Sequence, residues 1–140
     1  MVDNVRVEIR GLREFRGALQ QIERELPREL AVRYLERARD LAGRVASQVP
    51  RLTGRAAGSV APRPAASGAA LVAGGARAPH FPWLEFGGAV GRNRSVRREL
   101  VPDGRWIYPT IAEAGDEIGQ AAGDAVESVA RRAGFEVRGS

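Results

Sequence analysis

The chain begins with apolar residues that alternate with charged ones. Val5, Val7 and Ile9 alternate with arginine and glutamate, and Gly11 follows. A period of two is typical of a strand with one buried face. We therefore predict a half-buried strand over residues 5–9.

The following stretch has helical spacing. Apolar residues recur every three or four positions, at Leu12, Phe15, Leu19, Ile22, Leu26, Leu30, Tyr34, Ala38, Leu41, Val45 and Val49. Charged residues fill the other face, as in an amphipathic helix. Proline disrupts a helix interior, so Pro27 predicts a break or kink, or the start of a second helix. Pro50 ends the pattern.

The middle of the chain favours strands. Ser59-Val60 begins one apolar run, and residues 69–73 form another between glycines. The segment "PHFPWLEFGG" (79–88) is also predicted to be extended, because Pro79 and Pro82 disfavour helix in the residue before each of them.

Turn-forming residues follow. Pro-Asp-Gly in "VPDGRW" (101–106) predicts a turn. Glycine and arginine dominate residues 87–98. We therefore predict a long loop or hairpin at about 87–105.

The helical period returns from Pro109. Its apolar face comprises Ile111, Ile118, Ala122, Ala125 and Val129, and Gly134 ends it before a short tail or final strand. The order of elements predicts a single α+β domain over residues 1–140. A small antiparallel sheet should pack against a long N-terminal helix and a C-terminal helix.

Composition removes several kinds of chemistry. All 22 basic residues are arginine, cysteine is absent, and His80 is the only histidine. Without lysine there is no Walker A lysine and no Schiff base. Without cysteine there is no thiolate nucleophile and no zinc–thiolate site. We expect no cofactor and no metal site.

The acidic residues do not suggest catalysis either. His80 and Glu85 are five residues apart, which places them on opposite faces of a strand. Glu113 and Glu117 share a helix face, where acidic side chains are normally just exposed to solvent. Asp116 is adjacent to Glu117, so their side chains do not converge. No nucleophile, base and orienting group come together, so we expect no enzyme.

Charge is distributed unevenly along a chain of net charge +5. Residues 51–108 carry nine arginines against three acids, whereas residues 109–140 carry three arginines against six acids. This asymmetry indicates surfaces with different partners, or simply solvated charge.

No apolar run approaches the ~20 residues of a membrane span, and the N-terminus does not resemble a signal peptide. We expect a soluble protein that lacks a membrane partner, with a radius of gyration of roughly 14 Å if compact.

The segment "RLTGRAAGSV" (51–60) raises two interpretations. Glycine-rich loops cradle phosphate, but this one lacks the lysine and the spacing of a P-loop and follows a helix rather than a strand. As a structural connection, Thr53 can cap a short turn and Gly54 gives the backbone freedom.

The same segment resembles a motif of the neck and tail-completion proteins of long-tailed bacteriophages. That motif, P-x-x-T-G-x-L-x-x-S after a long helix, is matched here by Pro50, Thr53, Gly54 and Ser59, while Ala56 stands in place of the leucine. Arg55 occupies the position between the glycine and the leucine of the motif.

Two further segments agree in order. "PHFPWLEFGG" resembles the family's aromatic-x-x-x-E-F-G-T segment, with Trp83 among its aromatics, Glu85, Phe86 and Gly87 matched, and Gly88 in place of threonine. "IYPTIAEAGDEI" resembles the P-x-[LI]-x-E-A segment that opens the family's C-terminal helix. The start, "VEIRGLREFRGALQQI", resembles its opening strand, glycine and helix.

The resemblance implies a structural virion protein. Such a protein would form a homo-oligomeric, hexameric ring at the head–tail joint, assembled in the host cytoplasm, with DNA passing through the lumen. Its partners would be other neck, portal-adaptor and tail proteins, and no catalysis is implied.

An alternative is a sequence-nonspecific nucleic-acid-binding protein. Arg92, Arg94, Arg97 and Arg98 lie in the predicted loop, and arginine binds phosphate in a bidentate manner. They could contact DNA in the lumen or a protein neighbour. Glu85, beside aromatic residues in this basic region, is interpreted as a half-exposed strand residue or as the partner of an arginine.

Overall fold

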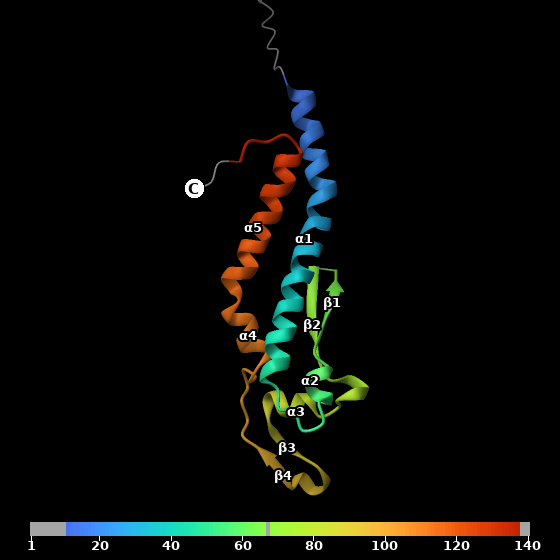
Figure 1. Cartoon of the computed structure of the whole chain (residues 1–140), viewed down its shortest axis with the longest axis vertical. Coiled ribbons are helices and arrows are strands. Elements are labelled where there is room, and N and C mark those ends of the chain that lie inside the picture. Colours follow the sequence, from blue (N-terminus) through green and yellow to red (C-terminus); the bar gives the residue numbers. More distant parts are fainter. Residues whose placement is uncertain (1–10, 67, 138–140) are drawn as a thin grey trace, which may run out of the picture.

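A single long helix forms the spine of an elongated molecule. The computed structural model describes residues 11–66 and 68–137. Helix α1 (Leu12–Gln48) has the β1–β2 hairpin on one side and helix α5 (Gly115–Arg132), running antiparallel, on the other (Figure 1). With a long N-terminal helix, a C-terminal helix and antiparallel strands, the chain is an α+β protein, as predicted.

Helix α1 is continuous through its proline. Pro27 lies inside the helix on its exposed side. Of the predicted alternatives, a break at Pro27 and the start of a second helix are therefore wrong. The fully buried residues, Ala38, Leu41, Ala42 and Val45, all lie in the C-terminal half. In the first two turns the apolar residues are about half exposed. The predicted strand over residues 5–9 lies outside the described residues.

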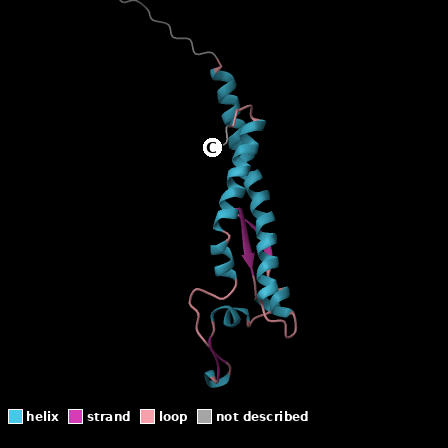
Figure 2. Cartoon of the chain, turned by 60° about the vertical axis from the view of Figure 1, so that its left-hand side comes forward, coloured by secondary structure: helices cyan, strands magenta, loops and turns pink. Residues whose placement is uncertain are grey.

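The strands form two separate antiparallel hairpins. In the first, β1 (Ala61–Ala65) pairs with β2 (Gly68–Val72), and both strands contact α1. In the second, β3 (Gly88–Val90) pairs with β4 (Val96–Arg98). The second hairpin projects beyond the ends of the two long helices (Figure 2).

The main core lies at the C-terminal end of α1. Short elements gather there: helix α2 (Arg55–Gly58), the 3-10 turn η1 (Gly75–Arg77) and helix α3 (Phe81–Phe86). The buried cluster comprises Val45, Val49, Ala56, Ala57, Ala78 and Phe81. One end of the molecule is therefore built from segments far apart in the sequence.

Helix α3 corrects the sequence analysis, which predicted extended structure for residues 79–88. Pro82 is one of the first two residues of α3. At such a position the missing N–H of proline would have no partner within the helix, so proline is tolerated there. The prolines mark the start of a helix rather than preventing one.

The C-terminal helical region is divided at Ala114. Helix α4 (Ile107–Glu113) ends there and α5 begins at the next residue. Of the predicted apolar face, Ala125 and Val129 are buried, together with Ala121. Residues 135–137 form no strand. Over the part of the chain described, no helix has the length and apolar character needed to cross a bilayer.

Candidate interaction surface

The segment after α1 is a structural connection. Gly54 precedes α2 with φ +77, a left-handed conformation that favours glycine, and the Arg55 backbone N–H donates to Thr53 Oγ1 at 3.4 Å. Ser59 Oγ donates to the Ala56 carbonyl at 2.7 Å and accepts from the Gly74 N–H at 3.0 Å. Ser59 thereby ties the end of α2 to the segment that follows β2. Pro50, just after α1, is exposed.

Glu85 is buried, with only 1% of its surface exposed. Its carboxylate accepts hydrogen bonds from the Trp106 N–H at 3.3 and 3.2 Å and from the Ile107 N–H at 3.0 Å. These N–H groups lie at the start of α4, where backbone donors lack partners within the helix. Glu85 is therefore not a half-exposed strand residue, and no arginine among the described residues forms an ion pair with it; a partner in a neighbouring subunit stays a prediction.

Arg105 binds the same region through backbone carbonyls. One terminal nitrogen donates to the carbonyls of Leu84 and Glu85 at 3.3 and 3.2 Å, and the other donates to the Glu99 carbonyl. This side chain thus joins α3 to the chain just after β4. It satisfies carbonyls near the C-terminal end of α3, where a helix has free acceptors.

Gly87 connects α3 to the hairpin. Its φ is +82, and a Cβ at this position would overlap the backbone carbonyl of Glu99. Beside it, the Val101 N–H donates to the Phe86 carbonyl at 2.7 Å. The matched residues Glu85, Phe86 and Gly87 therefore fix the base of the β3–β4 hairpin.

Two tryptophans complete this base. Trp83 Nε1 donates to the Gly88 carbonyl at 3.0 Å. The Arg98 guanidinium carbon lies 5.7 Å from the ring centre of Trp83 and 5.8 Å from that of Trp106, distances at which a cation is attracted to an aromatic face. Arg98 Nε is buried and has no hydrogen-bond partner among the residues that the structure describes. Of the four predicted arginines, Arg98 therefore belongs to the base of the hairpin.

The other three arginines lie on the projecting part. Arg92, Arg94 and Arg97 are exposed, and within the described ranges none of them forms an ion pair with an acidic side chain. The chain turns through η2 (Arg92–Arg94), where Asn93 and Arg94 have φ +59 and +53. We call Gly88–Arg98 the arginine hairpin; its base is fixed and its outer arginines face solvent.

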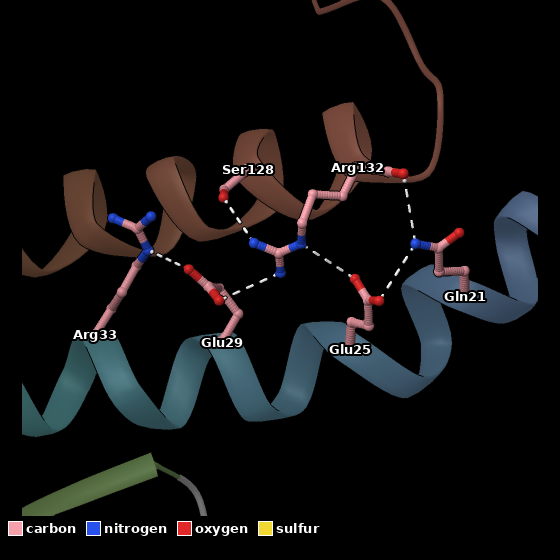
Figure 3. Close-up of polar contacts among 6 residues, drawn as sticks. All are labelled: Gln21, Glu25, Glu29, Arg33, Ser128 and Arg132. Atoms are coloured by element: carbon pink, nitrogen blue, oxygen red, sulfur yellow. Dashed lines mark hydrogen bonds and ion pairs between the residues drawn. The ribbon is translucent and has the colours of Figure 1, made fainter.

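A polar network that sequence reasoning missed joins α5 to α1 (Figure 3). Arg132 donates to Glu25 and Glu29, both at 3.3 Å, and to Ser128 Oγ at 3.1 Å. Arg33 binds the other oxygen of Glu29 at 3.0 Å. The hydrogen bond from Arg33 lowers the pKa of Glu29. Desolvation opposes this shift, and Arg132 adds to it. Glu25, Glu29 and Arg33 are spaced four residues apart, and this spacing was the sequence signal that could have indicated the network.

A second contact lies nearer the start of α5. Both terminal nitrogens of Arg44 bind the two oxygens of Glu117, at 3.0 and 2.9 Å. The Arg44 hydrogen bond lowers the pKa of Glu117, and the same bond raises that of Arg44. Glu117 is thus an interhelical partner, and it does not share a helix with Glu113, because α4 ends between them.

No group of three or more His, Asp or Glu side chains within the described region is placed to hold a metal ion. His80 is exposed at the start of α3. No family model, curated protein or solved structure matches this chain.

Proposed function

We propose that this protein is a structural subunit of the head–tail joint of a long-tailed bacteriophage, where copies form a ring around the passage for DNA. The proposal starts from the order of short motifs that resembles the neck and tail-completion family. Hexameric closure and contacts with portal-adaptor and tail proteins are part of the same proposal.

The observation that carries the proposal is where the motif residues lie. Gly54 and Ser59 shape the connection after α1, while Glu85 and Gly87 fix the arginine hairpin at the same end of the molecule. These residues build a scaffold with a projecting element. A ring subunit needs such an element, because it must present one surface to the copy ahead and another to the copy behind.

The direct test removes the gene from the phage or prophage that carries it. We expect particles in which DNA-filled heads and tails accumulate separately, and restoration by the gene supplied in trans. Electron microscopy with an antibody to the protein should label the joint of wild-type particles. Normal infectious particles in the absence of the gene would overturn the proposal.

No catalytic role is proposed. The purified protein should not hydrolyse ATP or DNA with magnesium or manganese present. Metal-dependent turnover that disappears when a single carboxylate is changed would contradict this part of the proposal.

A second candidate, sequence-nonspecific binding of nucleic acid, is favoured by one observation. Arg92, Arg94 and Arg97 are exposed on a projecting hairpin and have no acidic partner in the part of the molecule that is described. Such binding should be insensitive to sequence and should weaken steeply with salt. Anisotropy titrations of labelled duplex DNA at several salt concentrations measure both properties.

A further inference from the structure

The chain presents exposed acids that complement the arginine hairpin. On α4 and α5, Glu113, Asp116 and Asp124 are exposed and form no ion pair with any described residue. The other two acids of α5 are paired, Glu117 with Arg44 and Glu127 with Arg131. Three unpaired acids thus remain on the surface of these helices.

The two unpaired acids on α5 lie away from its buried face. Asp116 and Asp124 are eight residues apart, which corresponds to about 12 Å along a helix and about a quarter-turn around it. The buried residues of α5, Ala121, Ala125 and Val129, face α1 instead. Asp116 therefore lies on the outer side of α5, opposite its buried residues. Asp124 lies on the flank of α5, where it lines a groove with Arg33 and Arg37 of α1.

The two charged sets do not meet within one molecule. The arginine hairpin projects from one end, whereas α5 runs away from that end along α1 (Figures 1 and 2). No ion pair joins them among the described residues. Charge complementarity can be satisfied between two copies of the chain.

Apolar residues on the hairpin favour a protein partner over nucleic acid. Val90 and Val96 are directly paired across the strands and are 38% and 50% exposed. Protein interfaces combine arginine with apolar contacts, whereas a phosphate backbone is bound through charge and hydrogen bonds. The fixed base of the hairpin also lowers the ordering cost of binding.

We propose that the arginine hairpin of one copy binds the exposed surface of α4 and α5 of the next copy. Arg92, Arg94 and Arg97 contact a surface that carries Glu113, Asp116 and Asp124. Because the two surfaces differ, the contact is head-to-tail, and repetition closes a ring or extends a filament. The inference deepens the proposed function and rests on it for ring closure, since the contact alone does not select a ring.

Charge reversal provides the test. One variant carries Arg92→Glu, Arg94→Glu and Arg97→Glu, and the other carries Glu113→Arg, Asp116→Arg and Asp124→Arg. Each alone should raise the dissociation constant for self-association at least ~100-fold, because like charges then face each other. Mixed together, the variants should associate again in alternation, because every hairpin then meets an oppositely charged helix.

Native mass spectrometry and sedimentation velocity measure these outcomes at several concentrations. The matched control, Arg16→Glu, Arg24→Glu and Arg39→Glu, makes the same charge change on exposed positions of α1 and should associate like wild type. Circular dichroism checks that each variant is folded. Mixed variants should form particles with equal numbers of the two chains.

Three results would overturn the inference. One is a wild-type protein that stays monomeric up to about 1 mM, where even weak contacts are populated. Another is undiminished association of the hairpin variant. The last is a hairpin variant that still assembles but loses salt-dependent DNA binding, which would assign the arginines to nucleic acid. The gene-removal phenotype is independent of all three, so failure of this contact is distinguishable from failure of the proposed function.

Discussion

The backbone N–H of Trp106 donates to both carboxylate oxygens of Glu85, at 3.3 and 3.2 Å. The two residues are 21 positions apart in the sequence and belong to the segments that flank the arginine hairpin. A buried anion is costly unless hydrogen bonds satisfy it, and here backbone donors do so. The contact therefore holds the two ends of the hairpin region together.

Replacing Glu85 with glutamine should destabilise the protein by about 1–3 kcal/mol, because an amide NH₂ would then face backbone donors that need an acceptor. Urea denaturation measures the change. Glu36→Gln, an exposed position on α1, should change stability by less than about 0.5 kcal/mol. Equal effects of the two substitutions would show that the buried carboxylate has no structural role.

Leu41→Ala should cost about 2–5 kcal/mol, since Leu41 is 5% exposed and its loss would leave a cavity between α1 and its neighbours. Leu52→Ala is the matched control, because Leu52 is 99% exposed. It should cost a few tenths of a kcal/mol at most. Thermal unfolding of both variants tests the assignment of the buried face, which an unaltered midpoint for Leu41→Ala would refute.

Gly87→Ala should destabilise the protein more than Gly88→Ala. Both glycines have positive φ, +82 and +102, which costs about 1–3 kcal/mol for a residue with a side chain. At Gly87 the new Cβ would also meet the Glu99 carbonyl, whereas at Gly88 it would meet nothing within 4 Å. Denaturant titrations of the pair separate strain from steric overlap, and the reverse order would contradict the close approach at Gly87.

Acid should weaken the packing of α5 on α1. The pKa of Glu29 is lowered from an ordinary 4.5 chiefly by Arg33 of the same helix and further by Arg132 of α5. The pKa of Glu117 is lowered chiefly by Arg44 of α1. A carboxyl group whose folded pKa is lowered stabilises the fold above its unfolded pKa. That contribution is lost as pH falls from about 4.5 through the folded pKa. Both pairs are at least partly open to solvent, so the effect is modest.

The double variant Glu29→Gln and Glu117→Gln checks this direction. It should be less stable than wild type at pH 7, and the difference should shrink as pH falls below about 4.5, because wild type is then protonated too. Urea denaturation between pH 7 and pH 3 measures it, with Glu36→Gln as the control. A difference that stays constant across this range would exclude these ion pairs as its source.

Periodicity predicted the large elements well. The apolar spacing on α1 placed Ala38, Leu41 and Val45 on the buried face, because a helix that packs along its length must keep its apolar residues on one side. Helix α5 followed from the same reasoning, whereas β2 followed from a short apolar run between glycines.

Local rules failed where tertiary contacts decide. Pro82 reads as a helix breaker in isolation but is harmless at the start of α3. Glu85 allowed two interpretations, a half-exposed strand residue or an arginine partner, yet its carboxylate accepts hydrogen bonds from backbone N–H groups. Nearly every residue carries a backbone N–H, so the sequence does not show which of them will meet the carboxylate. Among the predicted loop arginines, Arg98 could not be separated from the others, because its two tryptophans come from different segments.

The length of α1 has a hydrodynamic consequence. A helix of 37 residues is about 55 Å long, whereas a compact chain of this size has a radius of gyration of roughly 14 Å. The single chain should therefore experience more friction than a sphere of 15.1 kDa and elute early from a sizing column. An elution volume resembling that of a dimer would then reflect the shape of one chain, and only a measurement of mass distinguishes an extended monomer from the first step of assembly.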